Sequence, residues 1–298
     1  YKMTKFNKIG LVGRPDHKGV VTSLKRLTSY LVNKEKSVFV DEATASLLDN
    51  PSANVVTKSE LSVSCDLVIV VGGDGSMLNV SKYVASADVP VIGVNRGKLG
   101  FLTDILPDEI ESKIDDVLSG SYSVEKRFLL DIFLHKDGDN EHLGSALNDV
   151  VLHPGSAAQM IEFELFIDDT FVYSQESDGL IIATPTGSTA YALSAGGPIM
   201  HPSLDAMVLA PMYPHSLSSR PVVVDGESQI KIMIPSTGSR SPQISCDGDV
   251  KYSASSGDRF LITKKKVSLH LIHPPNHSFY EACRSKLGWG SRLDKGHD

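Results

Sequence analysis

The chain reads Asp-Leu-Val-Ile-Val-Val-Gly-Gly-Asp-Gly-Ser-Met-Leu over residues 66–78. The apolar run at residues 67–71 predicts a buried strand, and a helical pattern begins at Ser76. The glycines between the strand and the helix allow a ligand to approach the backbone closely; they are Gly72, Gly73 and Gly75. The helix start offers unpaired N–H groups and a positive dipole end, which favour a phosphate group. Because Asp74 would repel phosphate, we expect it to hold a metal ion or accept a proton.

Length and charge limit the class of protein. The chain has 298 residues, which suffice for one or two domains with a sizeable core. It has 29 basic and 36 acidic residues, a formal net charge of -7. This balance argues against a protein that coats nucleic acid, because phosphate-backbone contacts need a basic surface. Any phosphate ligand must therefore be held by local donors, helix ends or a metal ion.

Cysteine content and hydropathy predict the compartment. The three cysteines, Cys65, Cys246 and Cys283, lie far apart in the chain and are odd in number. We therefore expect neither a disulfide framework nor a zinc pair, but a reducing intracellular setting. The residues before the first predicted strand contain no apolar leader, and no apolar run approaches the ~20 residues of a membrane span. These features predict a cytoplasmic protein that does not enter a membrane.

The first 122 residues alternate strand and helix patterns. Strands are predicted at residues 9–12, 38–40, 67–71 and 89–94, and helices at 24–32, 77–85 and 107–118. Such alternation predicts an α/β domain whose mostly parallel, Rossmann-like sheet has helices on both faces. Ligands of these sheets gather at the carboxyl ends of the strands, which is where Asp74 lies.

From residue 123 to residue 275 the pattern predicts a second, β-rich domain. At residues 161–167 the apolar side chains recur with period two. Further strands are predicted at residues 124–135, 144–153, 179–184, 221–224, 229–234, 259–263 and 267–272. The tail, residues 276–298, contains a helix that we expect to return to the first domain. Ser278 and Glu281 have the spacing of a capping box at the start of this helix.

A second glycine-containing loop follows the fourth predicted strand. It reads Asn-Arg-Gly-Lys-Leu-Gly-Phe-Leu over residues 95–102. Gly97 and Gly100 are compatible with an ordinary turn. The cations Arg96 and Lys98 beside glycines at a strand end, however, also suit a phosphate neighbour.

The longest run of small and polar residues is at 178–198. Within it, a strand ends in Thr-Pro-Thr-Gly-Ser-Thr at residues 184–189, and a helix is predicted over 189–195. A hydroxyl that acts as an ordinary helix cap would explain the motif. The number of small residues instead indicates close approach of a ligand. Tyr191 either stacks on a base or packs in the core.

Several other chemistries lack their motifs. There is no Gly-x-x-x-x-Gly-Lys-Ser/Thr loop of a P-loop enzyme. The first strand ends Gly-Leu-Val-Gly-Arg-Pro at residues 10–15, without the Gly-x-Gly-x-x-Gly of hydride-transfer Rossmann sites. Ser188 lacks the Gly-x-Ser-x-Gly elbow of α/β hydrolases. The ten histidines show no metal-ligand spacing, and His273 is interpreted as a strand end.

Together, these segments resemble those of bacterial NAD kinases, which phosphorylate NAD to NADP. The matching segments are residues 72–75, 95–97, 99–102, 147–151, 178–179, 184–198 and 245–248. They follow the family's order across nearly the whole chain. Gly-Gly-Asp-Gly is shared with diacylglycerol-type lipid kinases, whereas Thr-Pro-Thr-Gly-Ser-Thr-Ala-Tyr is far more specific. The family fold, an α/β domain followed by a β domain, agrees with the division near residue 122.

The resemblance implies roles for individual residues. Asp74 would be the catalytic acidic residue beside the adenosine 2′-hydroxyl of NAD, and Gly75 would contact the same nucleotide through its backbone. Asn148 and Asp149 would bind the adenosine part, and Asp178 would lie near the nicotinamide end. The residues expected around the adenine are Thr189, Ala190, Tyr191, Ala192, Leu193 and Ser194. Gly72, Gly73 and Gly75 would make room for the donor phosphates.

Three positions depart from the family pattern. Gln159, Glu176 and Asp249 stand where a histidine, a basic residue and a glutamine are frequent. Together with Arg96 they are secondary candidates for ligand contact.

The implied reaction uses ATP as phosphoryl donor and a divalent ion, expected to be Mg²⁺, for which the sequence assigns no ligand set. Asp74 would accept the hydroxyl proton, bind the metal or orient the hydroxyl. Polyphosphate as donor stays an alternative, as do a lipid kinase of the same superfamily and a non-catalytic dinucleotide sensor. Family members are commonly dimers or tetramers, so a homo-oligomer is expected.

Overall fold

The computed structural model describes residues 6–14, 18–48, 53–96, 99–136, 138–155, 159–236 and 241–289. The chain forms two compact units. Unit 1 comprises Tyr1–Lys126 and Leu269–Asp298, and unit 2 comprises Arg127–Ser268. Unit 2 is therefore an insertion into unit 1, and the chain crosses the two divisions within β6 (Ser123–Lys136) and β17 (Arg259–His273). No helix among the described residues is long and apolar enough to cross a membrane.

Unit 1 contains a parallel sheet. The strands are β1 (Lys8–Gly13), β2 (Ser37–Asp41), β3 (Asn54–Val56), β4 (Leu67–Val71) and β5 (Val91–Val94). Their order is β5-β4-β1-β2-β3, and the end of β17 extends the sheet beside β5, where Leu271 pairs with Val91. All five residues of β4 are buried, as expected for a strand covered on both faces. The predicted parallel α/β fold is confirmed.

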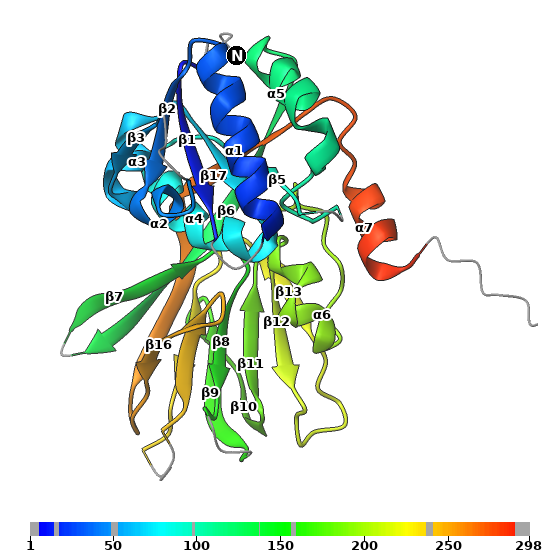
Figure 1. Ribbon diagram of the computed structural model, residues 1–298. Coiled ribbons are helices and arrows are strands. Elements are labelled where there is room, and N and C mark those ends of the chain that lie inside the picture. The colour runs from blue at the N-terminus through cyan, green and yellow to red at the C-terminus, as the bar shows by residue number, and fades with distance from the viewer. Residues whose placement is uncertain are drawn as a thin grey trace, which may run out of the picture. The chain divides into compact units, whose positions relative to one another are not determined.

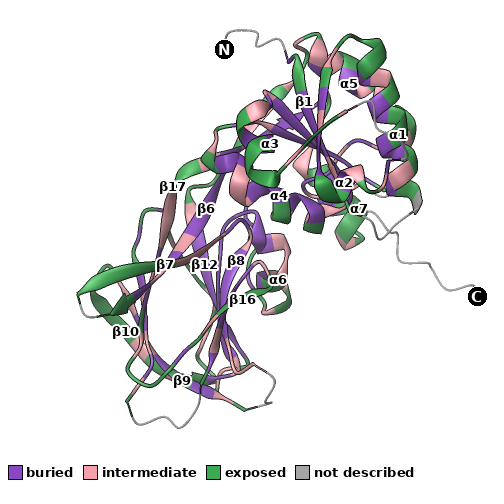
Figure 2. Ribbon diagram, turned by 60° about the vertical axis from the view of Figure 1, so that its left-hand side comes forward, coloured by how far each residue is buried: buried purple, intermediate pink, exposed green. Residues whose placement is uncertain are grey.

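Helices cover both faces of this sheet (Figure 1). They are α1 (Lys18–Asn33), α2 (Glu42–Ala45), α3 (Lys58–Ser64), α4 (Asp74–Ser86), the 3₁₀ turn η1 (Pro107–Glu109) and α5 (Ile110–Leu118). A further helix, α7 (Phe279–Leu287), lies beside the loop after β5, where the ring of Phe279 contacts that of Phe101. On one face α1 and α5 pack together, joined by an ion pair between Arg26 and Glu111. On the other face α3 packs closely on β1. Gly10 of β1 is so near to Leu61 of α3 that a Cβ atom on the glycine would lie 3.2 Å from the leucine side chain. Figure 2 shows the resulting buried strands beneath helices with exposed outer faces.

Unit 2 is built from antiparallel strands. One sheet has the order β13-β12-β11-β8-β15-β16 and the other β10-β9-β14-β17, with β6 paired to β17 and β7 paired to β6. The remaining strands are β7 (Asp139–Ala146), β8 (Asp149–His153), β9 (Ile161–Ile167), β10 (Thr170–Ser177), β11 (Gly179–Ala183), β12 (Ala206–Met212), β13 (Val222–Asp225), β14 (Ile230–Met233), β15 (Gln243–Cys246) and β16 (Asp249–Ser253). One apolar cluster joins both sheets, with Leu152 and Ile182 from the first and Phe163 and Phe260 from the second. The predicted β-rich second domain is confirmed.

Four local predictions need correction. The strand predicted at residues 144–153 is split into β7 and β8, and the strands predicted at 259–263 and 267–272 are the single strand β17. The helix predicted at residues 189–195 is a 3₁₀ turn, η2 (Gly187–Thr189), followed by the one-turn helix α6 (Tyr191–Ser194). α7 begins after Ser278, but the Ser278 side chain forms no capping hydrogen bond. A capping box does occur at Thr57 and Glu60, at the start of α3, which the sequence pattern did not reveal.

Candidate functional site

In unit 1, the carboxylate of Asp74 is fixed by the loop that follows β5. Asp74 is the first residue of α4, directly after Gly73 at the N-cap position. Its Oδ2 accepts the backbone N–H of Phe101 at 3.0 Å, and its Oδ1 accepts that of Leu102, also at 3.0 Å. The Thr103 hydroxyl donates to Oδ1 at 3.3 Å. These three hydrogen bonds therefore fix the orientation of the Asp74 carboxylate at the carboxyl ends of β4 and β5.

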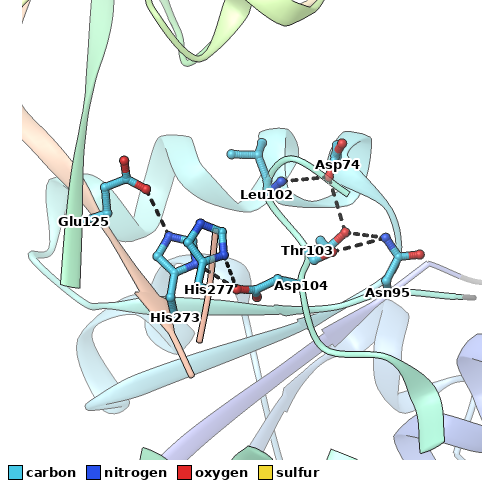
Figure 3. A network of polar contacts seen from close by, with 8 residues as sticks. All are labelled: Asp74, Asn95, Leu102, Thr103, Asp104, Glu125, His273 and His277. Carbon is cyan, nitrogen blue, oxygen red and sulfur yellow. Dashed lines mark hydrogen bonds and ion pairs between the residues drawn. The ribbon is translucent and has the colours of Figure 1, made fainter. Parts of the chain in front are cut away.

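A buried amide orders the hydroxyl of Thr103 (Figure 3). Nδ2 of Asn95 donates to Oγ1 of Thr103 at 2.7 Å, so that the hydroxyl proton is directed to Asp74. Oδ1 of Asn95 accepts the N–H of Arg96 at 2.6 Å. Asn95 and Thr103 are almost fully buried, at 7% and 0% exposed. Sequence reasoning named neither as a site residue, although Asn95 lies within the quoted motif.

A small pocket lies at the N-terminus of α4. It has a volume of about 190 Å³ and is lined by Arg14, Val20, Gly72, Gly73, Gly75, Ser76 and Arg96. A Cβ atom on Gly72 would lie within 3.0 Å of the Ser76 side chain, whereas one on Gly75 would meet no atom within 4 Å. Arg14, Arg96 and the N-terminus of α4 therefore border one cavity, an arrangement suited to a phosphate group. Gly97 and Lys98 lie outside the described residues.

In unit 2, Asp247 holds the turn that carries Asn148 and Asp149. Its Oδ1 accepts the N–H of Asn148 at 2.8 Å and that of Asp149 at 3.3 Å, and its Oδ2 accepts that of Leu147 at 3.0 Å. Asp247 and Gly248 have φ values of 50° and 83°, a left-handed turn between β15 and β16. Sequence reasoning did not assign Asp247 a role, although an Asp-Gly pair between two strands is a signal of such a turn.

The Asp149 carboxyl has an unusual proton affinity. Its residue is 5% exposed. Burial, and secondarily the negative charge of Asp247, raise the pKa of Asp149 to about 7. Near neutral pH this group thus exists in both protonation states. It can donate or accept a hydrogen bond, as a site for ribose hydroxyls requires.

The 184–189 segment closes tightly over the same turn. Thr184 donates its hydroxyl to the Leu147 carbonyl at 2.6 Å, and its N–H bonds the Asn148 carbonyl at 2.9 Å. A Cβ atom on Gly187 would lie less than 3.0 Å from the Asn148 carbonyl oxygen. The hydroxyls of Thr184 and Ser188 therefore bond backbone carbonyls. At Gly187, the close contact that the small residues suggested is with another part of the same chain.

The residues expected around the adenine differ in exposure. Tyr191 is 50% exposed, which favours a surface for stacking over the alternative of a core residue. Ser194 is exposed and Thr189, Ala190 and Leu193 are half-buried. Ala192 is fully buried in the apolar cluster around β11 and β12, so it exposes no surface to a ligand in this structure.

The other predicted residues are spread over unit 2. Asp178 precedes β11, whereas Asp149 pairs with Ala183 at the far end of that strand, about 16 Å away at ~3.3 Å per residue. Gln159 and Glu176 are exposed. Asp249 is exposed too and lies 3.7 Å from Lys251. Ligand contacts of these residues stay predictions.

The histidines are a case in which spacing was misleading. Their pattern in the sequence indicated no ligand cluster. The structure nevertheless brings His273 and His277 together with Asp104, with one ligand atom of each within 4.8 Å of the others. His273 is the last residue of β17 and His277 lies in the irregular segment before α7, so no single helical or strand periodicity links the two histidines.

Comparison with known proteins gives one consistent result. Residues 9–122 match the ATP-NAD kinase N-terminal domain, and residues 147–274 match the ATP-NAD kinase C-terminal domain. The NAD kinase of Hahella chejuensis is 55% identical over 294 residues, covering 99% of each chain. The NAD kinase of Azotobacter vinelandii is 54% identical, covering 99% of this chain and 100% of the relative.

Two solved structures have the same fold. Yeast NADH kinase complexed with NADH has a TM-score of 0.88 and 26% identity, covering 98% of this chain and 91% of its own. An NAD kinase from Archaeoglobus fulgidus in complex with ATP has a TM-score of 0.69 and 24% identity, covering 94% of this chain and 96% of its own. At that identity the archaeal structure supports the fold alone.

Proposed function

Because the chain belongs to the ATP-NAD kinase family, we propose that it transfers the γ-phosphoryl group of ATP to the 2′-hydroxyl of the adenosine ribose of NAD, giving NADP. The observation that carries this proposal is the carboxylate of Asp74, held by three hydrogen bonds at the start of α4. Beside it lies the pocket bordered by Arg14 and Arg96.

The hydrogen bonds that Asp74 forms with described residues leave one acceptor position on its carboxylate. A carboxylate has about four such positions, two on each oxygen. Oδ1 uses both, for Leu102 and Thr103, and Oδ2 uses one, for Phe101. We assign the remaining position on Oδ2 to the ribose hydroxyl. Asp74 thereby orients the hydroxyl oxygen, which is one of the three roles that the sequence left open.

In the proposed reaction, the ribose oxygen forms a bond to the γ-phosphorus while the bond from that phosphorus to the ADP oxygen breaks. The hydroxyl proton passes to Asp74 or to the transferred phosphoryl group. Phosphoryl transfer passes through a loose transition state and depends mainly on positioning and charge neutralisation. A fixed carboxylate that orients the hydroxyl is therefore sufficient.

Arg14, Arg96 and the N–H groups at the start of α4 are assigned to the donor phosphates. These groups supply positive charge where the leaving ADP gains negative charge. Mg²⁺ commonly keeps several waters and binds substrate phosphates together with one or two carboxylates. Such an ion, when bound, would neutralise phosphate charge.

The adenosine part of NAD is assigned to unit 2. Asn148 and Asp149 lie on a turn fixed from both sides, by Asp247 and by Thr184. A fixed turn of this kind holds polar groups for ribose hydroxyls without a cost of ordering on binding. Tyr191 presents its ring at the surface for the base. The yeast relative, complexed with NADH, supports a dinucleotide as the ligand.

The experiment is an assay of NADP formation from NAD, ATP and Mg²⁺. We expect Asp74→Asn to lose most turnover while it keeps its fold and binds NAD. The matched control is Asp66→Asn, because Asp66 also accepts two backbone N–H groups in unit 1, at 2.9 and 3.0 Å, but outside the site. Near wild-type turnover in Asp74→Asn would overturn the assignment of Asp74.

The same assay separates the alternatives. A lipid kinase would form no NADP, and a dinucleotide sensor would bind NAD but form none. The pocket beside Asp74 is lined by glycines, by Ser76 and by two arginines, with Val20 as the one apolar side chain among its described lining residues. These residues do not form the apolar groove that a lipid substrate would need. Replacement of ATP by polyphosphate tests the donor, and the mass of the protein in solution tests the expected homo-oligomer.

A further inference from the structure

A second polar cluster in unit 1 lies outside the proposed phosphate site (Figure 3). Nδ1 of His273 and Nδ1 of His277 lie 2.8 and 2.9 Å from the same oxygen, Oδ2 of Asp104. The two imidazole rings are stacked, with centroids 3.6 Å apart and planes inclined by 17°. The side chains of Asp104, His273 and His277 are 9%, 2% and 18% exposed. Three potential metal ligands thus converge in a nearly water-free place.

Three separate parts of the unit position these groups. Asp104 follows the loop that holds Asp74, and His273 is the last residue of β17. His277 lies in the turn before α7, where Asn276 has a φ of 71°. Asp104 and His273 are 169 residues apart in the chain. The cluster therefore joins the C-terminal segment to the loop beside the site.

Two carboxylates face the two rings. Nε2 of His273 lies 3.1 Å from Oε2 of Glu125, and Nδ1 of each ring lies near Oδ2 of Asp104. Carboxylates gathered around one largely buried cluster favour a bound cation, because opposite charges attract more strongly where water is excluded.

An unsatisfied atom points to the same missing partner. Oδ1 of Asp104 is buried and has no hydrogen-bond partner among the described residues. A buried carboxylate oxygen without a partner is costly, so such atoms in folded proteins are normally bonded to a donor or a metal ion. This observation is independent of the convergence of the two histidines on Oδ2.

We propose that Asp104, His273 and His277 bind a divalent transition-metal ion, with Zn²⁺ as the best match to two imidazole nitrogens and a carboxylate. Imidazole ligands suit zinc and its neighbours and do not suit Mg²⁺. Ligand atoms around a tetrahedral zinc ion lie about 3.3 Å apart, and the ligand atoms here lie within 4.8 Å of one another. Because each imidazole binds a metal in its ring plane, the two stacked rings tilt apart when they share one ion. The site is separate from the proposed reaction and does not depend on it.

Glu125 is placed to be the hydrogen-bond partner of a metal-bound histidine. Metal-bound histidines usually donate their second ring N–H to a carboxylate, which fixes the ring and its tautomer. Glu125 stands in that position toward Nε2 of His273. Two nitrogens and the Asp104 carboxylate leave further coordination positions for water. A cavity of about 650 Å³, partly lined by Asp104 and His277, gives access to them.

The test uses the full-length protein, freed of metals with a chelator and titrated calorimetrically with Zn²⁺ in excess Mg²⁺, without ATP or NAD. We expect one Zn²⁺ per chain at a site that Mg²⁺ does not fill, and visible absorption of a low-symmetry site when Co²⁺ replaces Zn²⁺. His277→Ala and Asp104→Asn are expected to remove this site. Glu125→Gln is expected to weaken it about 10- to 100-fold.

Two controls make the result specific. His215→Ala removes an exposed histidine of unit 2 and is expected to bind Zn²⁺ like the wild type. Asp74→Asn is expected to lose turnover but to bind Zn²⁺ fully, so that failure of this proposal and failure of the kinase assignment are distinguishable. The proposal is overturned if the folded wild type binds no Zn²⁺, or if folded His277→Ala binds Zn²⁺ with unchanged affinity. Should Asp104→Asn fail to fold, the partly exposed His277 still provides the test.

Discussion

Gly100 and Asp74 are in such close contact that no larger residue fits at position 100. A Cβ atom on Gly100 would lie less than 3.0 Å from Oδ1 of Asp74 and from Oγ1 of Thr103. The glycine thus lets the backbone of the loop reach the carboxylate. Its φ is not in the left-handed region, so the requirement comes from space rather than from backbone conformation.

We therefore expect Gly100→Ala to displace the Asp74 carboxylate and to lower kcat about 100-fold, the effect of a misplacement of about 1 Å. NAD binding by unit 2 should change little. Gly19→Ala is the matched control, because a Cβ atom there meets no atom within 4 Å and the residue lies in α1. Steady-state kinetics of both variants check the prediction; unchanged kcat in Gly100→Ala would contradict it.

The pKa of Asp149 predicts a pH dependence of NAD affinity. Burial and the charge of Asp247 raise this pKa to about 7. Ribose hydroxyls donate best to the ionised carboxylate, so bound NAD lowers the pKa of Asp149, and affinity must rise with pH up to about 7 and then level off. We expect a loss of up to tenfold per pH unit below that value. Isothermal titration with NAD between pH 5.5 and 8 measures it, and a flat profile in Asp149→Asn is the control.

The same group makes the ligand-free protein less stable as pH rises. An acid whose pKa is raised on folding keeps its proton in the folded state at pH values where the unfolded chain has lost it. The free energy of unfolding therefore falls between about pH 4 and pH 7, by on the order of 4 kcal/mol. Urea unfolding of wild type and Asp149→Asn across this range should give a difference that grows with pH. An equal slope in both proteins would refute the buried-acid explanation.

Asp247 is expected to act on NAD through the turn that it holds. Asp247→Asn loses carboxylate acceptors for the N–H groups of Leu147 and Asn148, so the turn loosens, and KM for NAD should rise about tenfold with little change in kcat. The variant also removes a charge that raises the pKa of Asp149, so the pH profile should move to lower pH. Asp258→Asn is the control, because Asp258 likewise accepts a turn N–H, from Ser255 at 2.8 Å.

Gly187 permits the contact between the 184–189 segment and the Asn148 carbonyl. An alanine there would force its Cβ atom to within 3.0 Å of the backbone oxygen, which cannot rotate away. We expect Gly187→Ala to lower the free energy of unfolding by about 1–3 kcal/mol or more. Gly144→Ala, whose Cβ would have an ordinary 3.4 Å contact with Lys251, should change stability far less. Thermal unfolding compares the two.

Local patterns in the sequence were sufficient to predict β1, β2, β4 and β5 of unit 1 and the position of Asp74, but not the short strand β3. A buried apolar run that ends in glycines and opens a helix has few alternatives, and the carboxyl end of β4 lies where that pattern placed it. The alternation at residues 161–167 gave β9 for the same reason. The helix predicted at residues 189–195 was wrong in length, because the hydroxyls there bond local carbonyls and the chain turns after one helical turn.

Long-range contacts were not accessible from local patterns. Asp247 bonds residues about 100 positions earlier, and Asp104 meets His273 only because β17 lies beside β5. Strand order, not periodicity, creates both contacts. Asn95 and Thr103 were similarly missed, since their partnership with Asp74 depends on how the loop after β5 folds back.

The discontinuous makeup of unit 1 has a consequence for biosynthesis. A ribosome synthesises the whole of Arg127–Ser268 before it reaches Leu271, the residue of β17 that pairs with Val91. Throughout that interval β5 is an open edge, with unpaired backbone groups that invite misassociation with other chains. The nascent inserted unit can fold first, while the earlier segment waits for its last strand. A chain that ends prematurely before residue 269 would keep that edge permanently open and be prone to aggregate.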